Sequence, residues 1–158
     1  MSAVRTVAVV AAILSSGLVA GLFAAFAYSV MPGMNRAQSA AAVDVMQRIN
    51  TAILNPVFGV LFGGGLIVAI IAAAVSWNDG LRWWTLGALV CYVVGVLITV
   101  MLNVPLNDLL ARAGTPTTAS EANRVWSAFA GEWARWNVAR LVAHLTGFAL
   151  LVVGLASR

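Results

Sequence analysis

Arg140 and His144 are the residues in this sequence with the greatest capacity for chemistry. They lie one helical turn apart inside the apolar run 136–156, and Asn137 precedes them on the same face. A charged side chain at the centre of a lipid-facing helix costs about 3 kcal/mol or more, so we expect this face to point into the protein. An arginine there can hold an anion, and a histidine can accept a proton. The structural alternatives are an Arg140 that reaches lipid head groups and a neutral His144 bonded to a carbonyl.

A second polar face follows the apolar stretch 83–104 and its continuation. At spacings of seven, four and four it carries Tyr92, Thr99, Asn103 and Asn107. Pro105 has no N–H, so it leaves the carbonyl of Met101 free, and in lipid that carbonyl needs a partner. The amides of Asn103 and Asn107 therefore serve either to satisfy the broken backbone and bind neighbouring helices, or to orient a ligand.

The composition places these residues in a membrane protein. The chain is 62% hydrophobic and 9% charged, whereas soluble domains carry roughly 25% charged residues. Its net charge of +4 comes from nine arginines that are scattered and form no basic cluster, so we expect membrane lipid and no nucleic acid as partners. One cysteine and one histidine exclude an intrachain disulfide and disfavour a zinc site built by this chain alone, and we expect no cofactor.

The hydropathy pattern predicts a single all-α membrane domain over 1–158. It is an integral membrane four-helix bundle with short interfacial helices in the first and third connections. A span needs about 20 apolar residues, and the expected spans cover about 7–31, 56–77, 83–104 and 136–156. "AFA" at 25–27 resembles a signal-peptide cleavage site, but the apolar run before it is longer than that of usual signal peptides. Asn55 and Pro56 predict the start of the second span.

Aromatic residues extend the face of Arg140 and His144 toward the N-terminal side. The sequence "TASE" at 118–121 matches a capping box, from which one long helix is expected to begin. On that helix we expect the tryptophans to anchor the chain at the membrane interface. Their face contains Trp126, Phe129, Trp133 and Trp136.

Glycines at a spacing of four predict close helix packing in the first two spans. Gly17 and Gly21 form one such pair, and Gly59 and Gly63 form the other. Small residues at this spacing let helices approach closely in lipid.

The topology brings the polar residues to one end of the bundle. With four spans, both termini and the turn at 78–82 share one side, and the two long connections share the other. On the long-connection side lie Tyr28, Asn55, Asn103, Asn107, Asn137 and Arg140, with His144 one turn deeper. Few polar groups within apolar walls are typical of a ligand pocket. Its expected walls are Phe26, Phe58, Phe62, Trp133 and Trp136.

The chain resembles the anthrone oxygenase-like family of small four-helix membrane proteins. The resemblance rests on "GLFAAFAYSVMPGM" (21–34), "MQRINTAILNPVF" (46–58), "NVPLNDLL" (103–110) and "WARWNVARLVA" (133–143). It implies oxidation of polyketide anthrones to anthraquinones with molecular oxygen, without metal or flavin. It supports Asn55, Asn103, Asn107, Trp136, Asn137 and Arg140 as shared positions, whereas His144 lies outside the matched stretches.

Two functions follow as hypotheses. In a cofactor-free membrane oxygenase for a hydrophobic polyketide or phenol, His144 acts as base and Arg140 holds the oxyanion, while Asp108 is the rival base. The alternative is a non-catalytic protein that binds a lipid or quinone, or a small subunit of a larger membrane complex or homo-oligomer. Either protein is expected to be multi-pass, in a bacterial plasma membrane.

Overall fold

Helices account for the whole ordered architecture. The computed structural model describes residues 2–157, and among them it has no strand. Short π-helical turns, labelled η, interrupt three of the four long rods. The first rod comprises α1 (Ala3–Ala25), η1 (Phe26–Val30) and α2 (Met31–Met34), and the second comprises α4 (Pro56–Phe58), η2 (Gly59–Gly63) and α5 (Gly64–Val75). The third rod comprises α6 (Arg82–Ile98), η3 (Thr99–Asn103) and α7 (Val104–Arg112), and the fourth is α8 (Ala119–Ala156). Helix α3 (Ser39–Ala52) connects the first rod to the second.

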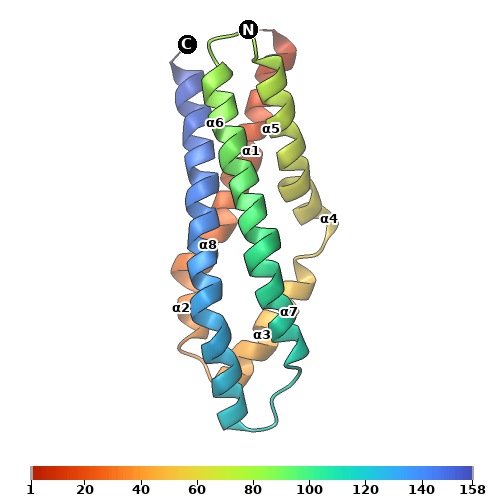
Figure 1. Ribbon diagram of the computed structural model, residues 1–158, viewed down its shortest axis with the longest axis vertical. Helices are drawn as coiled ribbons and strands as arrows, with labels where there is room; N and C mark the ends of the chain where they lie inside the picture. Colours follow the sequence, from red (N-terminus) through yellow and green to blue (C-terminus); the bar gives the residue numbers. More distant parts are fainter. Residues whose placement is uncertain (1, 158) are drawn as a thin grey trace.

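The four rods confirm the predicted membrane-spanning bundle. Each is long and apolar enough to cross a membrane, and each overlaps one expected span, although the second rod ends at Val75 rather than at 77. Both termini and the turn between α5 and α6 lie at one end, and the two long connections lie at the other (Figure 1). The helices expected in the first and third connections are α3 and α7.

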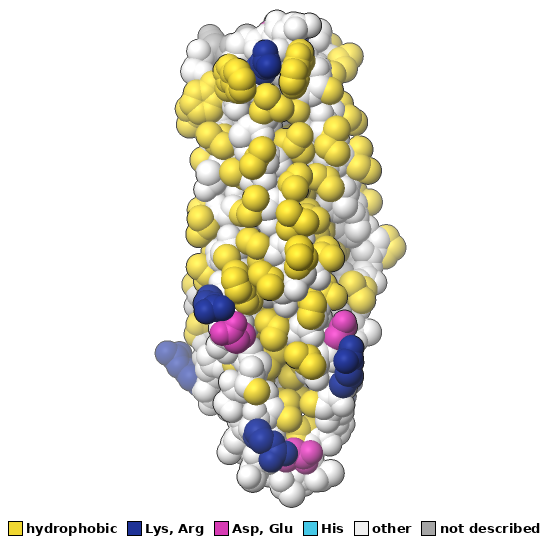
Figure 2. All heavy atoms as spheres, viewed as in Figure 1, with side chains coloured by type: hydrophobic (Ala, Val, Ile, Leu, Met, Phe, Trp, Pro, Cys, Tyr) yellow, Lys and Arg dark blue, Asp and Glu magenta, His cyan; other side chains and the backbone are white. Residues whose placement is uncertain are grey.

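The bundle extends beyond the bilayer on the side of the long connections. Helix α8 has 38 residues and is therefore about 57 Å long, whereas the hydrocarbon core is about 30 Å thick. On the face shown in Figure 2, hydrophobic side chains cover the half near the termini, and most charged groups gather toward the opposite end. Helix α8 is thus longer than a membrane span needs to be, and we call its start, together with α3 and α7, the projecting part.

The projecting part has its own core, and this corrects the prediction for the tryptophans. Trp126 and Trp133 are only 7% and 3% exposed. They pack with Met31, Val43 and Met46 from α2 and α3. Trp126 and Trp133 were expected as interfacial anchors and are instead interior residues, because α2 and α3 cover this part of α8, whereas Trp136 is half-buried.

The predicted helix caps form as expected, with one change of partner. Asn55 accepts a hydrogen bond from the N–H of Phe58 at 3.0 Å and thereby starts α4. Thr118 accepts the N–H of Glu121 at 3.2 Å. The Glu121 carboxylate accepts the N–H of Thr117 at 2.9 Å rather than that of Thr118.

The glycine pairs play a smaller role in packing than predicted. A Cβ at Gly17 would lie 3.1 Å from the ring of Phe148, so this glycine does permit a close approach. At Gly21, Gly59 and Gly63 a Cβ would meet nothing within 4 Å. Gly59 and Gly63 are exposed on the outside of the bundle, so they do not serve contacts within it.

Hydrogen bonds between helices satisfy the backbone at the π turn η2. Tyr92 of α6 donates its hydroxyl to the carbonyls of Leu61 and Phe62, at 3.1 and 2.9 Å. Ser15 of α1 donates to the Leu61 carbonyl at 2.5 Å. The absent side chain of Gly65 makes room for both hydroxyl groups. Tyr92 and Ser15 therefore bind three rods together where the α-helical pattern breaks.

Candidate functional site

A buried arginine is the centre of the candidate site. Arg140 is 7% exposed. Its Nε and Nη2 donate to Oδ1 of Asn137 at 3.4 and 3.1 Å, and its Nη1 donates to Oγ1 of Thr99 at 3.3 Å. Thr99 in turn donates to the carbonyl of Gly95 at 2.9 Å, which turns its oxygen lone pairs toward the guanidinium. Arg140 is thus held inside the bundle and does not reach head groups.

The positive charge of Arg140 is not balanced by an acid of the described chain. Within residues 2–157 it forms no ion pair. Its guanidinium instead faces the rings of Phe23 at 4.0 Å and Trp133 at 5.2 Å, measured to the ring centroids. Cation–π contacts offset part of the desolvation cost but bring no negative charge. An anionic ligand would supply what the protein does not.

Three asparagines connect the helices around Arg140. Asn137 donates to the carbonyl of Phe23 at 2.9 Å, and Asn103 donates to the carbonyl of Trp133 at 3.2 Å. Asn107 accepts the indole N–H of Trp133 at 2.8 Å. The amides therefore bind α8 to α1, η3 and α7. They do not bond to the carbonyl of Met101, which the sequence had suggested as their partner.

A cavity of about 280 Å³ lies beside the guanidinium. This volume is near the lower end of the roughly 300–1,000 Å³ range of small-molecule sites. Most of its wall is apolar. Its polar lining residues are Gln47, Asn50, Thr51, Thr99, Asn107, Asp108 and Arg140. Residues of all four rods, of α3 and of the segment that follows α3 line the cavity. They are Leu22, Phe23, Phe26, Gln47, Ile49, Asn50, Thr51, Ile53, Leu54, Phe58, Thr99, Val104, Asn107, Asp108, Ala111, Trp133 and Arg140.

His144 lies deeper and outside the cavity wall. Its ring is fully buried, and neither ring nitrogen has a hydrogen-bond partner. It packs against the rings of Tyr92, Phe23 and Phe62, with centroids at 4.5, 5.5 and 5.9 Å. A Cβ at Gly95 would overlap the imidazole, so this glycine makes room for it. Phe23 contacts both His144 and Arg140 and itself lines the cavity.

The structure brings only part of the predicted set together. Arg140, Asn107 and Trp133 line the cavity, while the buried Asn103 and Asn137 position them. The remaining predicted residues lie elsewhere. Tyr28 is 76% exposed on the outer surface, Asn55 is exposed and caps α4, and Trp136 is half-buried beneath the guanidinium of Arg135.

Helix α3 supplies cavity residues that the sequence reasoning missed. Gln47, Asn50 and Thr51 line the cavity, and Nδ2 of Asn50 is buried without a hydrogen-bond partner. Their spacing of three and four on an amphipathic helix was a usable signal. Phe23 was also missed, because nothing distinguishes it from other apolar residues of the first span.

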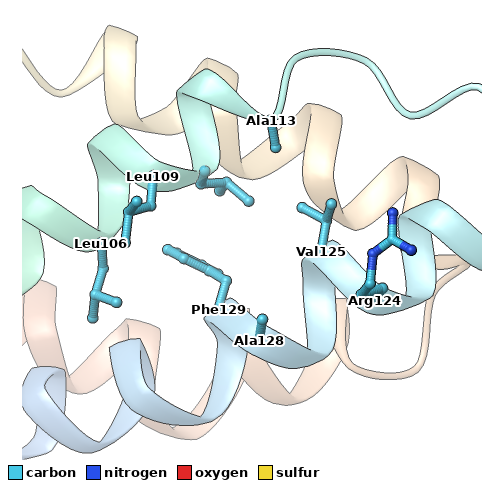
Figure 3. A pocket seen from close by; sticks show the side chains of 8 residues that line it. Leu106, Leu109, Ala113, Arg124, Val125, Ala128 and Phe129 are labelled. Atoms are coloured by element: carbon cyan, nitrogen blue, oxygen red, sulfur yellow. The ribbon is translucent and has the colours of Figure 1, made fainter.

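A second hollow lies between α7 and α8 in the projecting part. Its volume is about 340 Å³. Figure 3 shows leucine and phenylalanine side chains from the two helices facing each other, with Arg124 at one end. Arg124 is its only charged lining residue. Because it lacks convergent polar groups, it is a weaker candidate than the cavity beside Arg140.

The fold and the cavity define a class: a multi-pass membrane protein with a buried arginine, without an ion pair among the described residues, beside a mostly apolar cavity. Across residues 2–157, no three His, Cys, Asp or Glu side chains gather in a way that could hold a metal ion. The chain belongs to the anthrone oxygenase family, because the sequence model of that family matches residues 46–150. The matched range includes the second half of α3, all of α7 and all polar residues of the cavity. No curated protein and no solved structure gave a match.

Proposed function

We propose that this protein oxidises a hydrophobic phenolic or polyketide substrate with molecular oxygen in the cavity beside Arg140, in a bacterial plasma membrane. The observation that carries the proposal is the buried Arg140 guanidinium, which has no acid partner within 4 Å among the described residues and faces a mostly apolar cavity. Membership of the anthrone oxygenase family supports the reaction type.

The chemistry needs an anion-stabilising group more than a redox group. An anthrone has an acidic CH₂ group, and loss of one proton gives an electron-rich aryloxide. This anion reduces O₂ to a carbon-bound peroxide, and the new C–O bond replaces the C–H bond. Loss of the second C–H proton and cleavage of the O–O bond release water and leave a ketone, so that one substrate and one O₂ give one quinone and one H₂O. Arg140 would stabilise the aryloxide through its charge.

Asp108 is the better-placed proton acceptor. Its side chain lines the cavity, whereas His144 does not and is walled off by three aromatic rings. A general base must come within hydrogen-bond distance of the proton that it removes. We therefore assign the first proton transfer to Asp108 and give His144 a packing role behind Phe23.

Access from the lipid phase follows from the junction of α3 and α4. Ile53, Leu54 and Phe58 line the cavity at this junction. Leu54 is also 80% exposed, so it reaches from the cavity wall to the outer surface. A water-insoluble substrate would pass this junction from the bilayer without crossing water.

The decisive measurement is oxygen uptake by the purified protein with a simple anthrone, with quinone formation followed optically. Arg140→Gln should lower the rate about 100-fold or more, the effect of losing an oxyanion-stabilising group. The matched control is Arg135→Gln, since Arg135 lies on the same helix but is exposed and paired with Glu132. Equal rates for wild type and Arg140→Gln would refute the assignment of the site.

The choice of base is tested in the same assay. Asp108→Asn should reduce uptake strongly, while His144→Ala in a protein that still folds should retain most of it. Asp44→Asn is the control, because Asp44 is an exposed acid paired with Arg48. If His144→Ala reduced uptake strongly and Asp108→Asn did not, His144 and not Asp108 would be the general base. A wild-type protein that consumes no oxygen but retains a quinone or lipid would instead support the binding function.

A further inference from the structure

An arginine lies between two tryptophan rings at the other end of the molecule. The guanidinium carbon of Arg82 is 4.3 Å from the ring centroid of Trp77 and 4.7 Å from that of Trp83. The tryptophans are 49% and 72% exposed. Trp77 lies on the turn between α5 and α6, and Arg82 and Trp83 begin α6, at the end of the bundle opposite the cavity of Arg140.

Arg82 forms no ion pair within residues 2–157. The acid on the same turn, Asp79, is engaged by the guanidinium of Arg5 and by the N–H of Leu81. The Nε of Arg82 is buried and has no hydrogen-bond partner. Its guanidinium instead faces the two indole rings.

The position of Arg82 matches the depth of lipid head groups. Arg82 is the first residue of α6, and the apolar run that crosses the membrane follows directly. Exposed tryptophans are enriched at this boundary, where their rings contact both acyl chains and head groups. Figure 2 shows few basic side chains and many hydrophobic ones near the end that carries the termini.

We propose that Trp77, Arg82 and Trp83 form a binding site for the phosphate of an anionic phospholipid. The stacked rings hold the planar guanidinium in one orientation, and Nη1 and Nη2 donate to two phosphate oxygens. Arginine binds phosphate in this two-pronged way, whereas lysine acts as a point charge. The exposed indoles contact the lipid's upper acyl chain, which a free phosphate ion lacks.

The test is lipid retention by the full chain in mild detergent, measured by native mass spectrometry and by thermal unfolding. Phosphatidylglycerol is titrated against phosphatidylcholine and against inorganic phosphate. Wild type should retain phosphatidylglycerol preferentially and unfold at a higher temperature with it. Arg82→Gln should weaken retention about tenfold, the effect of losing one charge-assisted hydrogen bond.

Two further variants keep the result interpretable. Arg82→Lys retains the charge but loses the stacked fork, and it should bind more weakly than wild type. Arg124→Gln changes an arginine in the projecting part and should bind as wild type does. Unchanged retention in Arg82→Gln would overturn the site, and wild-type retention in Arg82→Lys would overturn its two-pronged geometry. An equal effect of inorganic phosphate would overturn a lipid as the ligand.

Discussion

Arg140 combines a functional role with a cost to stability. A buried charge without a counter-charge is paid for by neighbouring interactions, here the hydrogen bonds to Asn137 and Thr99 and the rings of Phe23 and Trp133. Replacing a buried ion pair by apolar residues of similar volume is often neutral or stabilising, because it removes the desolvation cost of the charges, and Arg140 bears that cost without a partner acid. Residues kept at such a cost are commonly those that function requires.

The first prediction follows from this cost. Arg140→Met should raise the free energy of unfolding by about 1 kcal/mol while it abolishes oxygen uptake. The measurement is thermal unfolding in detergent alongside the uptake assay. A marked loss of stability would mean that Arg140 is mainly structural, which contradicts the assigned role.

The second prediction concerns the space around His144. Gly95→Ala places a Cβ 2.7 Å from Cδ2 of the His144 ring, and overpacking of this kind costs about 1–3 kcal/mol. His144→Ala should remove the clash, so the double variant should be more stable than the sum of the two single variants indicates. Simple additivity in this double-mutant cycle would show that the contact is not tight.

At the scale of the helical elements, the π turns decide where side chains from other helices bond. Tyr92→Phe removes the donor to two carbonyls of η2, and we predict a loss of about 1–3 kcal/mol in stability. Tyr28→Phe is the matched control, since the other tyrosine is exposed and should give no change. Chemical or thermal unfolding of both variants measures the difference. Equal stability would show that water or another group satisfies η2.

The sequence predicts how far along the bundle axis each polar residue lies better than it predicts whether the side chain points into the bundle or outward. Apolar length and loop order placed Asn103, Asn107 and Arg140 at one end, which the structure confirms. Tyr28 and Asn55 lie at the correct end of their helices but are exposed. The direction of these side chains depends on how each helix is rotated about its own axis, and packing determines that rotation. A span that is apolar on all sides has no periodic pattern from which the rotation could be predicted.

Tertiary packing also explains what the sequence did not predict. Trp126 has the pattern of an interfacial anchor, yet α3 folds back over it and Asn35 accepts its indole N–H at 3.0 Å. The same return of α3 brings Gln47 and Asn50 to the cavity. Contacts between segments so distant in sequence leave no local periodic signal.

At the scale of the whole molecule, the distribution of arginine predicts the orientation in the membrane. The projecting end carries Arg36, Arg48, Arg112, Arg124 and Arg135, whereas the opposite end carries Arg5 and Arg82 among the described residues. Short loops rich in arginine face the cytoplasm. We therefore predict that the cavity end is cytoplasmic and that the C-terminus lies outside. Reporter fusions measure this directly. A reporter enzyme that is active only outside the cytoplasm should be active when it is fused to the C-terminus. An inactive fusion would show that the orientation is the opposite one.

The π turns have a consequence for how relatives of this chain can differ in length. A π turn is an α-helix that holds one additional residue. Deleting one residue from Gly59–Gly63 would restore ordinary helical pairing with little rotation of Pro56–Phe58 relative to α5, because the π turn absorbs the additional residue within one turn. The carbonyls that Tyr92 and Ser15 now bond would then be paired within the helix. Relatives with a single-residue gap in this turn should therefore keep the fold and the cavity wall but no longer need hydroxyl groups at the positions of Tyr92 and Ser15.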